Sequence, residues 1–254
     1  MRFCKRYRMH KDKAYKVLAH AHHLSHKQAK ALIDKGLVRS GGKRLTLARA
    51  EIPTNSTFEV LEIKSPKVLF RDECILALDK PPFIESYDLC AMFEGWTLLN
   101  RLDKQTSGVI LLVKDKSEFH HKAKESFKKQ EVYKEYIALA HGRLVDSVVI
   151  EQPIVTIKKG FAKSYIDKKG LYAHTELTPL AIVGKKTLLQ ARILTGRTHQ
   201  IRVHCQSINH PLYGDTIYGK ADNAKRLMLH AHKIALLGYE FISPIPKDLQ
   251  IEHL

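Results

Sequence analysis

Apolar residues recur at helical spacing near the start of the chain. Residues 14–21 carry one apolar stripe, and a second begins after Ser25, which forms the pattern of a capping box with Gln28. Gly36 is placed to end this second helix. Short strands are expected at 37–38, 45–47 and 58–60, with a turn at 40–42. The pattern predicts a small unit of two helices and a hairpin over residues 1–62.

The rest of the chain alternates short apolar runs with a few helical stretches. The run 109–113 is continuously aliphatic, which is typical of a strand buried on both faces. Helices are expected at 117–129 and 199–208, further strands at 74–78, 132–140 and 188–193, and a linker at 62–73. This spacing indicates an α+β class, with a second and larger unit over residues 63–254.

The net charge indicates which kind of partner the protein binds. The 254 residues include 43 Lys and Arg against 26 Asp and Glu, which gives a formal net charge of +17. Residues 1–64 hold 15 basic and 5 acidic residues, so more than half of the excess lies in a quarter of the chain. RNA, DNA or an acidic membrane would each suit such a surface. The local concentration favours a dedicated nucleic-acid-binding unit at the N-terminus.

Cysteine usage and hydropathy indicate the compartment. The four cysteines are scattered, and none forms a C-x-x-C pair that would favour a zinc or disulfide site; they are Cys4, Cys74, Cys90 and Cys205. The longest aliphatic run, 109–113, is far too short to cross a bilayer, and no signal-peptide core follows the basic N-terminus. We therefore expect a cytoplasmic protein with reduced thiols and no membrane segment.

Asp103 is the first candidate for chemistry. It lies in the segment 100–108, which leads directly into the 109–113 strand. A strand fixes the position of a carboxylate at its mouth, while the loop leaves that carboxylate reachable. From spacing alone, a structural aspartate that caps a turn is the simpler alternative.

The segment 194–204 supplies a second set of candidates. Ile201 is placed to face the core, while His199 and Arg202, three residues apart, share another side of the expected helix. Arg197 precedes the helix, and a helix N-terminus with a nearby arginine is suited to bind an anion. The alternative is a surface arginine that only solvates the helix.

Residues 10–62 resemble the ribosomal S-four-type RNA-binding domain. The resemblance rests on the segment 25–38 (SHKQAKALIDKGLV) and the following Gly42-Lys43. It implies that the second helix and the next turn meet RNA through a basic face, with Lys27, Lys30, Lys35, Lys43 and Arg44 as the contacts. A solvated basic surface is the alternative. Ser40-Gly41 departs from the Val-Asn that is common in this family.

Residues 68–240 resemble the RluA-type pseudouridine synthase family. The resemblance rests on four patches in family order: 78–82 (LDKPP), 101–108 (RLDKQTSG), 133–138 (YKEYIA) and 195–204 (TGRTHQIRVH). The segments 210–215 and 229–231 follow as in the family. The resemblance implies a long, mostly antiparallel mixed sheet with a central cleft, an isomerase that acts on RNA, and no cofactor or metal.

The resemblance also implies roles for particular residues. Asp103 would be the catalytic carboxylate, Arg202 its partner, and Tyr136 the ring that stacks on the target base and assists the proton step. Ile201 would pack beneath the base, and Lys80 would support the catalytic loop or contact the RNA backbone. Arg101, Arg197 and His199 complete the expected RNA contacts.

The expected chemistry is physically coherent. A lone buried carboxylate would have its pKa raised, and a neighbouring guanidinium offsets that effect. A stacked uridine must be extruded at a cost of a few kcal/mol, and stacking on Tyr136 returns about 1–3 kcal/mol. The carboxylate either attacks the anomeric carbon or removes a neighbouring sugar proton, and the residues leave both routes open.

Some positions depart from the family pattern. Asn100 stands where the family usually has His, Gln105 replaces a frequent Asp, and Phe83 holds a position that is often Gly. The segment 83–99 is also short. These departures concern the shape of the RNA entrance and therefore the choice of uridine.

Two other function classes compete. One is an RNA chaperone or ribosome-assembly factor without chemistry, which the presence of Asp103, Tyr136 and Arg202 opposes. The other is a metal-dependent nuclease, suggested by His20, His22, His23 and the pair His120-His121 among 15 histidines. His20 and His23 could share a helical face, but no nearby carboxylate completes a ligand set. Adjacent histidines on a helix point about 100° apart and make poor joint ligands. We expect a monomer that modifies large-subunit ribosomal RNA, with transfer RNA as the alternative substrate.

Overall fold

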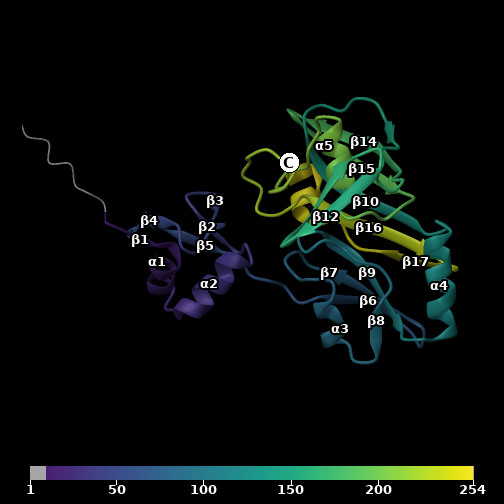
Figure 1. Ribbon diagram of the computed structural model, residues 1–254, viewed down its shortest axis with the longest axis horizontal. Coiled ribbons are helices and arrows are strands. Elements are labelled where there is room, and N and C mark those ends of the chain that lie inside the picture. Colours follow the sequence, from purple (N-terminus) through teal and green to yellow (C-terminus); the bar gives the residue numbers. More distant parts are fainter. Residues whose placement is uncertain (1–9, 254) are drawn as a thin grey trace, which may run out of the picture. The chain divides into compact units, whose positions relative to one another are not determined.

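The computed structural model describes residues 10–253 and divides the chain into two compact units, residues 1–63 and 64–254. Figure 1 shows the elements of both units, and each unit is described by itself. Within the described residues, no helix is long and apolar enough to cross a membrane.

The N-terminal unit consists of two helices and two small antiparallel sheets. Its elements are β1 (Lys11–Lys13), α1 (Ala14–Ala21), α2 (His26–Asp34), β2 (Val38–Ser40), β3 (Lys43–Arg44), β4 (Glu51–Pro53) and β5 (Phe58–Val60). Both helices lie where the sequence predicts them, and the capping box between Ser25 and Gln28 is present in both directions. Apolar faces of α1 and α2 pack together around Leu18 and Ile33.

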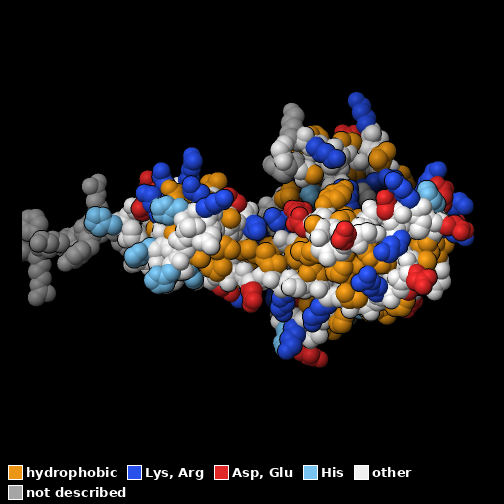
Figure 2. Space-filling model, turned by 90° about the horizontal axis from the view of Figure 1, so that it is seen from below, with side chains coloured by type: hydrophobic (Ala, Val, Ile, Leu, Met, Phe, Trp, Pro, Cys, Tyr) orange, Lys and Arg blue, Asp and Glu red, His pale blue; other side chains and the backbone are white. Residues whose placement is uncertain are grey.

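One strand of this unit differs from its expected place. The prediction put a strand near 45–47, whereas β3 is Lys43–Arg44. The reason is the tight turn at Gly41 and Gly42, which both adopt positive φ and allow Ser40 to pair with Lys43. Figure 2 shows histidine side chains beside Lys and Arg side chains on the visible face of this unit.

A ten-stranded sheet organises the larger unit, in the order β11-β14-β15-β10-β16-β9-β7-β6, with β17 paired to β16 and β8 to β9. The strands are β6 (Lys67–Arg71), β7 (Ile75–Lys80), β8 (Trp96–Leu98), β9 (Ser107–Lys114), β10 (Tyr133–His141), β11 (Val148–Ile150), β14 (Thr175–Val183), β15 (Lys186–Ile193), β16 (Leu229–Leu236) and β17 (Tyr239–Ile242). Among the described residues, β9 and β16 form the one parallel pair, and the other pairs are antiparallel. The fold is therefore α+β with a mixed, mostly antiparallel sheet, as the sequence predicts.

Several strands of the larger unit were not predicted, among them β8, β11, β14, β16 and β17. The expected linker at 62–73 contains the edge strand β6, so that prediction is wrong for residues 67–71. The hairpin of β12 (Ile154–Lys159) and β13 (Phe161–Ile166) forms a separate two-stranded ribbon.

Gly108 lies where the two halves of the sheet meet. Its φ is +110°, and a Cβ at this position would lie 2.1 Å from the backbone oxygen of Ala231 on β16. Only glycine permits this approach of β9 to β16. The parallel pairing of the central strands therefore begins directly after the Asp103 loop.

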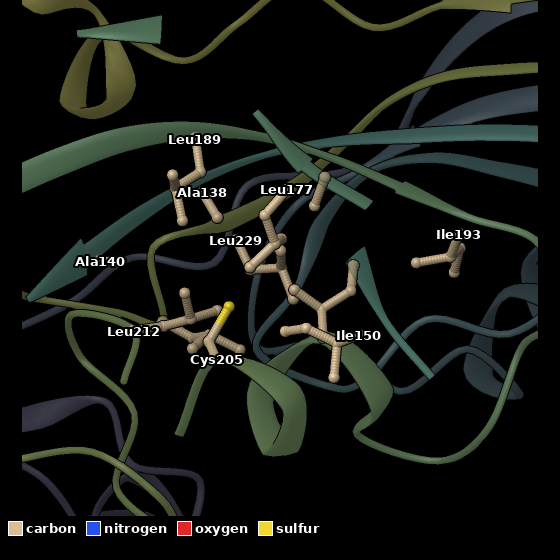
Figure 3. Packing of buried hydrophobic residues seen from close by; sticks show 12 residues of the cluster. Ala138, Ala140, Ile150, Leu177, Leu189, Ile193, Cys205, Leu212 and Leu229 are labelled. Atoms are coloured by element: carbon tan, nitrogen blue, oxygen red, sulfur yellow. The ribbon is translucent and has the colours of Figure 1, made fainter. Parts of the chain in front are cut away.

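The helices pack on the faces of the sheet. They are α3 (Asp88–Met92), α4 (Glu118–Lys128) and α5 (Gln200–Ser207), followed by the 3₁₀ turns η1 (Lys247–Leu249) and η2 (Ile251–His253). Ile201 and Cys205 of α5 pack against Leu177, Leu189 and Leu229 of the sheet, and Figure 3 shows Cys205 beside this cluster. The core thus fixes α5 relative to β10 and β15, the strands that border the candidate site.

Candidate active site

Asp103 is held in a hydrogen-bonded turn at the start of β9. The amide of Thr106 donates to the Asp103 carbonyl at 3.0 Å, and the Asn100 side-chain oxygen accepts from the Leu111 amide at 2.9 Å. The strand that follows is buried throughout residues 109–113. The loop is therefore anchored at both ends, and its carboxylate, with 25% of the side chain exposed, faces open space.

A second segment supports the loop from outside. The Ser86 hydroxyl donates to the Leu102 carbonyl at 2.7 Å and accepts from the Leu102 amide at 3.0 Å. The Phe83 amide donates to the Lys104 carbonyl at 2.7 Å. Phe83 has a φ of +72°, the region that favours glycine, which gives a physical reason for glycine in the family at this position.

Lys80 is fully buried beside this segment. Its ammonium donates to the carbonyls of Pro81 at 3.1 Å, Ile84 at 3.0 Å and Lys104 at 3.3 Å. Burial lowers the pKa of Lys80 to about 8, against the opposing charge of Asp103. Of the two roles expected for Lys80, its contacts favour support of the loop over contact with RNA.

The segment before α5 is organised by a buried amide. The Gln200 oxygen accepts from the Thr195 hydroxyl at 2.8 Å and from the Arg197 amide at 2.9 Å, while its nitrogen donates to the His174 carbonyl at 2.9 Å. His199 caps the helix with a φ of +56°. His199 and Arg202 both approach the Asp103 carboxylate and so share one side of this segment, as their spacing predicts.

Arg202 joins two carboxylates that lie far apart in the sequence. Its Nη1 donates to Oδ2 of Asp103 at 2.9 Å, and its Nε and Nη2 donate to the two oxygens of Asp215 at 2.7 and 2.8 Å. The two-bond contact with Asp215 fixes the plane of the guanidinium and leaves Nη1 for Asp103. The expectation that Asp103 and Arg202 meet is confirmed.

The charges of this triad reinforce one another. Although burial opposes a charged guanidinium, the hydrogen bonds and charges of Asp215 and Asp103 raise the pKa of Arg202. In return, Arg202 and two backbone amides lower the pKa of Asp215 against its own burial. The guanidinium is therefore a permanent positive charge beside the Asp103 carboxylate.

A cavity of about 870 Å³ opens in front of Asp103 and Arg202. Tyr136 on β10 lines it, and burial together with the charge of Asp103 raises the pKa of the Tyr136 phenol, so the hydroxyl stays protonated at neutral pH. A smaller recess of about 80 Å³ adjoins Asp103, and Ile201 lines it while packing into the core. The space is of the size that receives a nucleotide-sized ligand.

The other expected contacts are placed as follows. Arg101 is exposed at the rim, and Arg197 and His199 also line the cavity. His199 lies 3.8 Å from Asp103, and burial lowers its pKa. The basic residues expected to meet RNA in the N-terminal unit are exposed or half-buried there; they are Lys27, Lys30, Lys35, Lys43 and Arg44.

Sequence reasoning missed several residues that shape this site. Asp215, Gln200 and Lys134 appeared only within motifs and were given no role, and nothing signalled Ser86 as part of the site. A buried carboxylate opposite a buried arginine becomes visible only when the fold brings residues 202 and 215 together. The polar residue types alone carry no such information.

The histidines considered as metal ligands do not lie together in the part of the chain that the structure describes. Among residues 10–253, no group of three or more His, Cys, Asp or Glu side chains is arranged to hold a metal ion. His20 and His23 do not share a helical face, because α1 ends at Ala21 and His23 has a φ of +52°. His120 is buried, whereas its neighbour His121 is exposed.

Comparisons with known proteins identify the family to which this fold and site belong. The sequence profile of the RNA pseudouridylate synthase family matches residues 94–207. An uncharacterized RNA pseudouridine synthase of Helicobacter pylori (strain ATCC 700392 / 26695) is 59% identical over 241 residues, which cover 94% of this chain and 100% of the relative. The chain belongs to the RNA pseudouridine synthase family and is thus an isomerase of uridine in RNA.

Two further proteins are similar to this chain over more than two thirds of its length. The ribosomal large subunit pseudouridine synthase D of Nitrosomonas europaea is 30% identical, covering 72% of this chain and 63% of that protein. The structure of human RNA pseudouridylate synthase domain containing 1 matches with a TM-score of 0.61 and 26% identity, covering 73% of this chain and 86% of the other.

Proposed function

We propose that the protein isomerises a uridine of large-subunit ribosomal RNA to pseudouridine, with Asp103 as the catalytic carboxylate. The observation that carries the proposal is the 2.9 Å bond between Asp103 and Arg202 at the edge of a nucleotide-sized cavity. The Nitrosomonas relative named for the large ribosomal subunit supports ribosomal over transfer RNA.

The three side chains divide the work. Asp103 attacks C1′ of the ribose, or takes a proton from C2′, and the bond from C1′ to N1 of uracil breaks. Uracil rotates in the cavity and its C5 bonds to C1′. On the first route this breaks the ester bond between Asp103 and C1′, and on the second route Asp103 returns the proton to C2′. The proton on C5 is then lost, and N1 gains one. Arg202 holds the Asp103 carboxylate in place through their hydrogen bond, and Tyr136 stacks on the base while its protonated hydroxyl serves the proton transfer.

The direct test replaces the carboxylate and maps the product. Asp103→Asn preserves the shape of the side chain, and we expect pseudouridine formation to fall at least about 1000-fold, as for loss of a covalent or acid–base catalyst. Pseudouridine should be mapped across total RNA from cells with the wild-type gene, the Asp103→Asn gene and no gene. A site in large-subunit RNA that depends on Asp103 is the expected result. Normal modification by the variant would remove Asp103 from its role.

Residues 10–62 are proposed as an S-four-type RNA-binding domain that docks the substrate. The supporting observations are two packed helices with a capping box and exposed lysines on and after α2. The Lys30 ammonium lies 4.4 Å from the centre of the Tyr15 ring, and this cation–π contact fixes the position of one positive charge of the surface.

Removal of this charge should weaken RNA binding without changing the chemical step. The variant replaces four lysines by Gln, namely Lys27, Lys30, Lys35 and Lys43. We expect KM to rise about tenfold or more and kcat to stay within about threefold, because about four phosphate contacts are lost. The matched control replaces four exposed lysines of the larger unit: Lys122, Lys168, Lys185 and Lys220. Equal effects of the two variants would contradict a dedicated docking unit.

A further inference from the structure

Lys134 is a cation inside the active-site cavity without an anionic partner. Its side chain extends from β10 two residues before Tyr136, and both residues line the cavity. The residue is 7% exposed. Its ammonium donates to the Leu194 carbonyl at 2.7 Å and lies 5.7 Å from the centre of the Phe127 ring. Within residues 10–253, no carboxylate forms an ion pair with it.

Arg197 faces the same space. Its Nε donates to the carbonyl of Tyr172 at 2.8 Å, and no ion pair with a carboxylate is found for it within the described part of the chain. The charge of Arg197 acts directly on Lys134: burial first, and then this repulsion, lowers the pKa of Lys134 to about 8. Two like charges are thus held near each other on one wall of the cavity.

Such an arrangement works against folding and therefore needs another explanation. Arg202, a few residues further along, is matched by Asp103 and Asp215. At the cavity rim, Lys104 lies 3.9 Å from Glu85 and Lys128 lies 3.8 Å from Glu125. Lys134 is buried and Arg197 is half-buried, and neither forms an ion pair with a carboxylate of residues 10–253. Buried charges in proteins are normally paired or bind a ligand of opposite charge.

We propose that Lys134 and Arg197 form a phosphate-binding subsite that holds an RNA backbone phosphate next to the uridine extruded onto Asp103 and Tyr136. This inference rests on the proposed function and adds a residue to its site. A phosphate supplies the missing negative charge, and the guanidinium and ammonium together offer the donors that its oxygens require. Because Lys134 and Tyr136 share one face of β10, the base and its neighbouring phosphate would be held by one strand.

The subsite can be tested by the salt dependence of RNA binding, which does not require turnover. Lys134→Met keeps a straight, apolar side chain and removes one charge. With an oligouridylate of about 12 nucleotides, we expect the affinity at 0.1 M salt to fall about tenfold and the slope of log affinity against log salt to fall by about 0.7, the value of one phosphate contact on a single strand. Lys134→Arg should restore the slope. The control Lys185→Met removes an exposed lysine outside the cavity and should leave the slope unchanged.

A purely structural role for Lys134 predicts a different result. Circular dichroism and urea unfolding should show that Lys134→Met folds as well as wild type, since the variant removes an unmatched buried charge. A slope equal to that of wild type in a folded Lys134→Met protein would overturn the proposal. A subsite that binds only free phosphate would also overturn the proposal. In that case inorganic phosphate at constant ionic strength would raise the Tm of wild type but not of Lys134→Met, while the salt dependence of RNA binding would have the same slope for both proteins.

Turnover then separates this inference from the proposed function. On transcribed large-subunit ribosomal RNA, we expect Lys134→Met to raise KM about tenfold with kcat within about threefold of wild type. Absence of pseudouridine with the wild-type enzyme would refute the proposed substrate, and the binding experiment would still decide on the subsite.

Discussion

The Asp103 loop is bordered by two buried cations, Arg202 and Lys80, that have different kinds of hydrogen-bond partner. Arg202 is bound by the carboxylates of Asp103 and Asp215, which raise its pKa. Lys80 is bound by three backbone carbonyls, and burial lowers its pKa to about 8. Carbonyl dipoles fix the position of an ammonium but do not restore the solvation that its charge loses.

The difference separates two tasks. On the side of Arg202, a permanent positive charge faces the Asp103 carboxylate. On the side of Lys80, the ammonium closes the segment 81–84 onto the backbone of Lys104, so its hydrogen bonds shape the loop. The first cation therefore serves electrostatics and the second serves geometry, although both lie within the field of Asp103.

The largest expected effect follows from removal of Arg202. Arg202→Met leaves the fully buried Asp215 without its partner, and we expect the free energy of unfolding to fall by about 3–5 kcal/mol. Pseudouridine formation should fall about 100–1000-fold or more, as for loss of a positioned donor in an active site. Urea unfolding and single-turnover kinetics measure the two effects.

A double variant sharpens this prediction. Arg202→Met combined with Asp215→Asn removes both buried charges, so stability should be partly restored while activity stays low. Arg202→Lys should also remain impaired, because an ammonium cannot reproduce the two-bond contact with Asp215. If the double variant is no more stable than Arg202→Met, Asp215 is not the partner that makes the single change costly.

The sequence predicted those parts of the site that are encoded locally. Asp103 lies in a run of turn formers before an aliphatic strand, and Arg202 lies on a helix whose apolar face includes Ile201. The contact between the two side chains was expected from the family resemblance, and in the structure Nη1 of Arg202 lies 2.9 Å from Oδ2 of Asp103. The catalytic roles of Asp103, Tyr136 and Arg202 remain predictions that the proposed experiments address.

What the sequence did not predict depends on long-range contacts. β6 was taken as a linker because an edge strand keeps Val68 and Phe70 exposed, at 52% and 39%, and so lacks a clear buried face. Ser86 and Asp215 have ordinary residue types, and their importance comes from partners 16 and 13 residues away. These contacts can be predicted only once the order of the strands in the sheet is known.

The smallest effect concerns the titration of Lys80. The folded protein lowers the pKa of Lys80 to about 8, while the unfolded chain keeps the ordinary value of a lysine. Between about pH 8 and pH 10 the unfolded chain therefore binds more protons, and the free energy of unfolding should rise with pH, by up to about 1.4 kcal/mol per unit for one group. Lys134, whose pKa is also lowered to about 8, adds a similar rise.

Lys80→Met should remove about half of this rise, and Lys185→Met, an exposed control, should leave it intact. Urea unfolding at pH 7.5, 8.5 and 9.5 provides the comparison. Arg202 adds nothing to the slope, since its charge persists throughout this window. An equal rise in the wild-type protein and in Lys80→Met from pH 8 to 9.5 would mean that Lys80 keeps its proton in the folded state. The carbonyls around the Lys80 ammonium would then stabilise its charge as well as the carboxylates stabilise the charge of Arg202. The contrast between the two sides of the loop would disappear.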